Sequence, residues 1–182
     1  MIDLLIYGHA AFGGLALAAG VLALSTKKGG KIHKLGGRIF YYAMLGSVIL
    51  ALIIASSPSH FNSFLLAIGL FSLYFVLAGK RALRHRGMEF NLSLDRLLAW
   101  FIFIIGFTMI LLPMLIQREI NVLLTIFGLL AIAFGIRDLR LIRDRSQMIK
   151  KRMISHVSKI LAGYISAITA FFVVNNILPG IW

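Results

Sequence analysis

The chain has 182 residues, of which 60% are hydrophobic and only 14% are charged. Soluble domains are about 45–50% apolar, so this composition excludes an ordinary soluble protein. The absence of cysteine excludes disulfides, thiolate metal sites and cysteine nucleophiles. A net charge of +13 accompanies this apolar composition, so the distribution of the basic residues becomes informative.

Six apolar segments follow one another along the chain, and each is about long enough to cross a bilayer as a helix. No linker or low-complexity tract divides them. They predict an all-α, polytopic integral membrane protein that forms a single six-helix transmembrane bundle. The predicted spans are about 3–25, 39–57, 61–79, 97–116, 121–137 and 154–178.

The basic residues alternate between connections. Segments 27–38, 80–96 and 137–152 hold five, five and seven of the 19 lysines and arginines, whereas the intervening connections hold one, Arg118. This alternation is typical of the positive-inside pattern and predicts that the three basic segments face inside and both termini face outside. It assigns the positive charge to topology and to anionic lipid head groups at the inner surface. Nucleic-acid binding is therefore not expected, and no oligomeric state is indicated.

The first predicted helix carries one face of small residues around a histidine. His9, Gly13 and Gly20 recur on this face at helical spacing. Small residues let neighbouring helices approach closely in lipid, and an ionisable residue within a span is a functional-site candidate. We expect this face to be buried, with His9 either in a site or bonded to a neighbouring helix.

Residues 27–38 are expected to form a flexible, strongly basic loop, because four glycines accompany the basic residues. His33 and Arg38 lie in this segment. His33 and His85 lie among lysines and arginines in polar segments and are expected at the surface, where the neighbouring positive charge disfavours both protonation and cation binding. His60, in the outer turn, is also expected to be exposed.

The sixth predicted helix has a second polar and small face that includes His156, Lys159 and Gly163. We expect this face to pack against that of the first helix, with Gly13, Gly20 and Gly163 as packing positions. In that arrangement His9 lies near Asn175 or Asn176, Thr169 lies slightly deeper, and His156 lies near His33. The stem of Lys159 is expected to reach back to the inner interface.

The acidic residues all fall at predicted helix ends or in connections, and none falls in the middle of a span. Coupled carriers usually keep a carboxylate within the membrane, so this pattern disfavours a coupled transporter. The sequence also lacks GxSxG, HExxH, Walker and dinucleotide motifs, so it assigns no enzymatic activity.

Three functions stay open on these residues. The leading hypothesis is a protein that handles a small molecule or lipid in a polar cavity between the first and sixth helices. Its candidate ligand-binding residues are His9, His33, Arg38, His156 and Lys159. The first alternative is a redox protein with haem b or a metal ion, in which His9 and His156 are the candidate ligands and His33 is a third candidate. The second is a structural subunit of a membrane complex.

Three stretches, GHAAFGGLALAAGVLAL, KKGGKIHKLGGRIFYYAML and ISHVSKILAGYISAITAFFVVNN, carry a family resemblance. The chain resembles a family of predicted bacterial multi-span membrane proteins without an assigned activity, and this resemblance implies a place in the bacterial inner membrane. The likeness covers the first two helices and the sixth, less than half of the chain. It directs attention to His9, His33, Arg38 and His156 and to nearby glycines, and it implies no reaction.

Overall fold

The computed structural model describes residues 2–87, 89–116, 118 and 120–175. Within these residues the chain is all-helical, as predicted. The helices are α1 (Ile2–Ser25), α2 (Lys31–Ser56), α3 (Ser63–Ala82), α4 (Ser93–Ile116), α5 (Val122–Arg143), α6 (Arg145–Lys150) and α7 (Arg152–Val174). All of these except the short α6 are long and apolar enough to span a membrane, so the chain is a multi-pass membrane protein.

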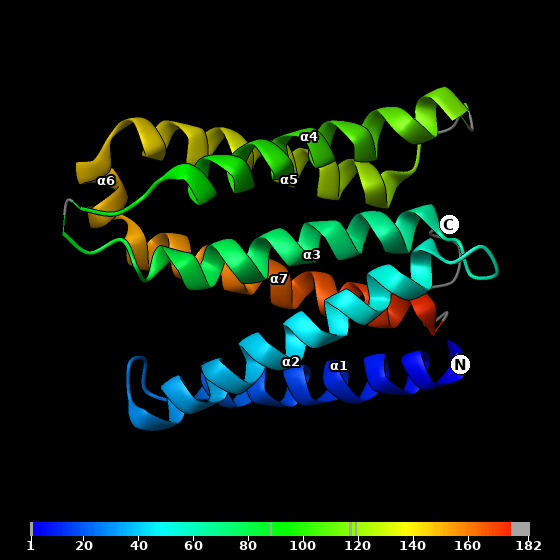
Figure 1. The fold of residues 1–182 in the computed structure, drawn as a ribbon, viewed down its shortest axis with the longest axis horizontal. Coiled ribbons are helices and arrows are strands. Elements are labelled where there is room, and N and C mark those ends of the chain that lie inside the picture. Colours follow the sequence, from blue (N-terminus) through cyan, green and yellow to red (C-terminus); the bar gives the residue numbers. More distant parts are fainter. Residues whose placement is uncertain (1, 88, 117, 119, 176–182) are drawn as a thin grey trace.

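The long helices associate in three pairs (Figure 1). The α4–α5 pair lies on one side, α3 and α7 form the middle layer, and α1 and α2 lie on the other side. Helix α3 is central, because it contacts α2, α4, α5 and α7. The start of α1 and the end of α7 lie at one end of the bundle, and α6 lies at the other. We call the α6 end the basic end, since it carries connections 26–30, 83–92 and 143–152.

Local signals explain where several helices begin and why two of them pack closely. The side chains of Asn62, Asn121 and Asp144 each accept a hydrogen bond from a backbone N–H in the first turn of the following helix. Helices α4 and α5 approach through glycine, because a Cβ on Gly106 would lie 2.7 Å from the carbonyl oxygen of Gly128. This close contact fixes the α4–α5 pair as a unit.

Several helices extend beyond the predicted apolar spans. Helix α2 begins at Lys31 rather than 39, and α4 begins at Ser93 rather than 97. Helix α5 continues beyond its apolar span to Arg143, as the helical spacing of the charged stretch after 136 predicts. The prediction followed the apolar runs, but a helix does not end where its side chains become charged. Most of the expected flexible loop at 27–38 is therefore the first turns of α2. The predicted end of the last span, 176–178, lies outside the described residues.

The small-residue faces of α1 and α7 pack mainly against α2 and α3, rather than against each other as predicted. A Cβ on Gly13 would meet Ser47 of α2, and one on Gly163 would meet Phe75 of α3. Of these three glycines, Gly20 is the one that faces the other helix, because it lies against the ring of Tyr164 in α7, whose hydroxyl donates to the backbone oxygen of Leu17 at 3.1 Å. The expected packing is therefore wrong over most of its length. A connection of five residues, 26–30, makes α2 the neighbour of α1 instead.

The polar groups at the opposite end follow from this pairing. His9 Nδ1 lies 2.9 Å from the backbone oxygen of Ser47 and 3.0 Å from its hydroxyl. The amide of Asn175 donates to Phe171 within α7, and Thr169 donates to Ile165 in the same way. His9 and Asn175, which were expected to lie near each other, therefore have different hydrogen-bond partners, and Asn176 lies outside the described residues.

Candidate functional site

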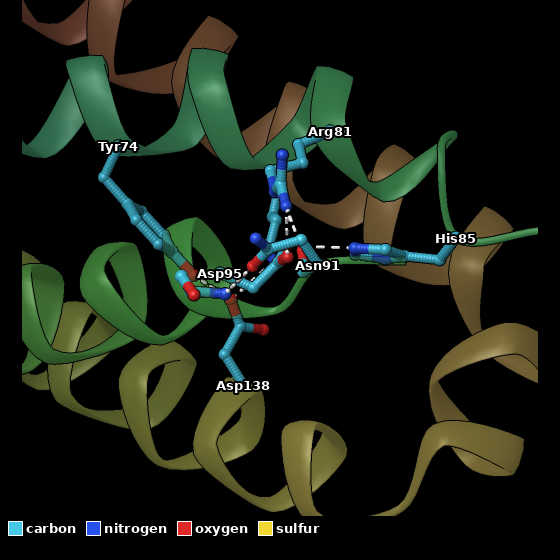
Figure 2. Close-up of polar contacts among 8 residues, drawn as sticks. Tyr74, Arg81, His85, Asn91, Asp95 and Asp138 are labelled. Carbon is cyan, nitrogen blue, oxygen red and sulfur yellow. Dashed lines mark hydrogen bonds and ion pairs between the residues drawn. The ribbon is translucent and has the colours of Figure 1, made fainter. Parts of the chain in front are cut away.

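A group of ionisable side chains lies inside the bundle near the basic end, where α3, α4, α5 and α7 meet. We call it the buried cluster (Figure 2). Its members are Tyr74, Arg81, His85, Asp95, Asp138 and Lys159. Ionisable groups inside a membrane bundle are costly, so each must be paired or serve a function.

Asp138 of α5 joins α5 to two other helices. Its Oδ2 atom accepts hydrogen bonds from the hydroxyl of Tyr74 in α3 and the ammonium of Lys159 in α7, both at 2.6 Å. The side chains of Asp138 and Lys159 are only 10% and 6% exposed. Tyr74 lies eight residues before the end of α3, about 12 Å along the helix. The pair therefore lies within the bundle rather than at its surface.

Asp95 makes a second link between helices. Its Oδ2 accepts from Arg81 at 2.7 Å, and its Oδ1 lies 2.9 Å from Nε2 of His85. Arg81 also donates to the backbone oxygen of Asn91 at 2.6 Å, which holds the connection between α3 and α4. Asp95 lies in the first turn of α4, where a carboxylate also stabilises the positive end of the helix dipole.

A small cavity separates the two carboxylates. Its volume is about 10 Å³, which is room for about one water molecule. Its polar lining comes from His85, Asp95, Asp138, Ser155 and Lys159, and Met148 of α6 contributes to its apolar lining. The cavity is too small for a lipid or an organic solute.

One oxygen of the Asp138 carboxylate has no hydrogen-bond partner among the described residues. This atom, Oδ1, is buried, and Figure 2 shows it pointing away from Tyr74. Leaving a charged acceptor unpaired inside a protein costs more than the 1–3 kcal/mol or so typical of a neutral group. Because Asp138 also lines the cavity, its free oxygen is placed to accept a hydrogen bond from a water held there.

The charges of the buried cluster balance when His85 is neutral, since Asp95 and Asp138 oppose Arg81 and Lys159. Arg137, next to Asp138, turns instead toward α7 and donates to the hydroxyls of Ser155 and Ser158 at 3.3 and 3.1 Å. A balanced network of this kind is sensitive to a single added proton, because one neutralised carboxylate leaves a buried cation without its partner.

Among the predicted ligand-binding residues, only Lys159 belongs to the buried cluster. It does not reach the interface as expected, because Asp138 holds it inside the bundle at 5% exposure. His33 and His156 lie at the basic end, with their Nδ1 atoms 2.9 Å and 2.8 Å from the carbonyl oxygens of Ala23 and Gly79. Half-buried His9 lies toward the opposite end and Arg38 is exposed, so the five residues do not form one site.

The surface predictions for the remaining histidines had different outcomes. His60 is exposed, as expected. His85 is only 4% exposed, so its predicted surface position is wrong. Its basic neighbours Arg84 and Arg86 point to solvent, while Asp95 draws the imidazole inward. No group of three or more His, Asp or Glu side chains that could hold a metal ion occurs within the described part of the chain.

Sequence reasoning missed Asp138, although a signal was present. Ala131, Gly135, Asp138 and Leu141 are all buried, and their spacings of four, three and three place them on one face of α5. The helix was expected to continue past 137, but its buried face was not followed as far as Asp138. Asp138 lies five residues before the end of α5 rather than in the middle of a span, yet it is buried inside the bundle.

Comparisons of the chain with protein-family models, with curated proteins and with solved structures return no match.

Proposed function

We propose that this multi-pass membrane protein is a proton-coupled transport protein in which Asp138 is the proton-binding group. The observation that supports this proposal is the buried Asp138–Lys159 pair, whose free oxygen lies at a polar cavity of water size. Intramembrane carboxylates with a titratable partner are the groups that proton relays and carriers use.

The coupling rests on where the ion pairs lie. Asp138 links the α4–α5 pair to Tyr74 and Lys159 of the α3–α7 pair, and Asp95 links the same two pairs through Arg81. Protonation of Asp138 at Oδ1 removes the charge that holds Lys159. Removing one partner of a buried ion pair costs about 3–5 kcal/mol, which is enough to shift a two-state packing equilibrium.

The size of the cavity favours a proton site over a binding site for a small molecule or a lipid. A volume of about 10 Å³ suits a proton or a water, so any larger solute must bind in another arrangement of the helices. The proton site would then supply the coupling, and the solute would use space that opens when the helix pairs move. The predicted cavity between the first and sixth helices stays a prediction.

The orientation belongs to the same proposal. The basic end faces the cytoplasm of a bacterial inner membrane and contacts anionic lipid head groups, and both termini lie outside. The resemblance to a family of bacterial multi-span membrane proteins is compatible with this placement. Exposed basic side chains at the start of α2, such as Lys31, Lys34 and Arg38, are suited to lipid phosphates.

A redox protein is the second candidate, supported by the histidine geometry. His33 and His156 lie at the same end, and each has Nδ1 within hydrogen-bond distance of a backbone carbonyl, which leaves Nε2 for a metal. A Soret band or stoichiometric metal in the purified protein would favour this candidate. A colourless, metal-free sample would remove it.

Infrared difference spectroscopy tests the proton site directly. As the pH is lowered, the reconstituted protein should gain the carbonyl band of a buried carboxylic acid, because Asp138 takes up a proton. The band should be absent from D138N and present in D144N, which removes an exposed carboxylate at the same end and leaves an equally good helix cap. A spectrum without any band that depends on Asp138 would refute the proposal.

A further inference from the structure

We infer that His85, held by Asp95, is the relay through which Asp138 exchanges its proton with water at the basic end. This inference rests on the proposed function, since it names the entry route to the same carboxylate. Three observations carry it: the position of His85, the closed path on the other side, and the shared cavity.

His85 lies at the boundary between solvent and the buried cluster. It belongs to connection 83–92, and its neighbours Arg84 and Arg86 are exposed while its own ring is 4% exposed. The ring lines the same cavity as Asp138. The two sequence neighbours of His85 are therefore in contact with solvent, while its ring faces the cavity at the proton site.

The path from Asp138 toward the opposite end is closed by aromatic side chains. Phe71 and Phe75 of α3 stack with centroids 4.5 Å apart, and Phe127 and Phe134 of α5 pack edge-on against them at 5.1 and 4.7 Å. Phe71, Phe75 and Phe127 belong to the buried core of the bundle. In this arrangement of the helices, the basic end is the side from which a proton reaches Asp138.

The charged groups around His85 come from every packed element. Arg81 belongs to α3, Asp95 to α4, Asp138 to α5 and Lys159 to α7, while Arg145 of α6 lies over the ring of Phe90, 5.4 Å from its centroid. The carboxylate of Asp95 is 2.9 Å from Nε2 and is fixed on its other side by Arg81, so it orients the ring. On the opposite flank the ring packs against Phe90 with centroids 4.9 Å apart.

The transfer conserves protons at each step. Nδ1 of His85 takes a proton from water at the basic end, and the imidazolium passes its Nε2 proton to Oδ1 of Asp95, to which it is hydrogen-bonded. The carboxyl group of Asp95 then releases a proton through a water in the cavity to Oδ1 of Asp138, which leaves Asp95 ionised as before. One proton enters and one leaves the ring, and a tautomer change returns His85 to its first state. A cavity of about 10 Å³ with several polar walls meets the requirements for a bridging water.

The experiment follows the Asp138 carbonyl band in time after a rapid pH jump. In H85A the rate of band formation should fall by about tenfold or more, since positioned acid–base groups contribute factors of about 100 or more. Free imidazole should restore the rate, whereas a bulky morpholine buffer of similar strength should not. H60A serves as the matched control, because His60 is an exposed histidine in an outer turn.

A second variant guards against a folding defect. H85Q can still donate a hydrogen bond to Asp95 but cannot carry a proton, so it should keep the stability of the parent protein and show the slow rate. An unchanged rate in H85A and H85Q would overturn the relay, and so would a slow rate that imidazole leaves unchanged. If the band itself does not depend on Asp138, the proposed function fails instead.

Discussion

Replacing Lys159 by methionine should destabilise the protein strongly, and replacing Asp138 at the same time should restore much of the stability. The single change K159M removes the cation from a pair whose side chains are at most 10% exposed. Tyr74 then remains the hydrogen-bond partner of a buried carboxylate among the described residues. Breaking one partner of a buried pair costs about 3–5 kcal/mol in the free energy of unfolding.

The double variant D138L/K159M removes both charges and leaves an apolar pair of similar volume. Such replacements are often neutral or stabilising, apart from about 1–3 kcal/mol for the hydroxyl of Tyr74, which loses its acceptor. Adding Y74F should recover that part. The assay is the free energy of unfolding in mixed micelles for the complete mutant cycle. A double variant less stable than K159M, or a K159M cost below about 1 kcal/mol, would refute a desolvated ion pair at this site.

Three further predictions test the packing and the orientation. G106L should lower the stability by about 1–3 kcal/mol or more, because its side chain meets the α5 backbone. G14L should change the stability by no more than about 0.5 kcal/mol, since a Cβ there meets nothing within 4 Å. Thermal unfolding of the two variants compares these effects. H9L should cost about 1 kcal/mol through its lost contact with Ser47, and S47A should lose part of the same energy in a mutant cycle. A cysteine at Ser59 should react with impermeant maleimide from outside the cell, and labelling only from the cytoplasm would reverse the proposed orientation.

The fold was predictable because membrane spans leave strong marks in a sequence. Apolar runs of about 20 residues and the alternation of basic connections are sufficient to place six spanning helices. The helix starts were less predictable, since Lys31 and Arg38 are charged yet lie in α2. Composition reports where hydrocarbon ends, whereas hydrogen bonding along the backbone decides where the helix ends.

The site was less predictable because it depends on which helices become neighbours. The small faces around Gly13 and Gly163 look alike in sequence, but the short connection 26–30 gives the first to α2, and α3 takes the second. Asp138 and Lys159 are 21 positions apart, and their pairing required the chain to reverse through α6. His85 appeared solvated among arginines, since sequence alone does not reveal the carboxylate of Asp95 beside it.

The central claim is that a proton on Asp138 changes how the α4–α5 pair packs on the α3–α7 pair. The native chain has no cysteine, so spin labels can be attached at introduced cysteines alone. Labels at the exposed positions Arg140 of α5 and Met153 of α7 report the separation of the two pairs at the basic end. A control pair at Leu97 and Arg140 reports distances within the α4–α5 pair.

Pulsed electron spin resonance should show the Arg140–Met153 distance shifting as the pH is lowered, with the control distance unchanged. In D138N, which imitates the neutral carboxyl, the shifted distance should already be present at neutral pH. A distance that is the same at every pH, and the same in D138N as in the parent protein, would contradict the coupling of Asp138 to the movement of the helix pairs.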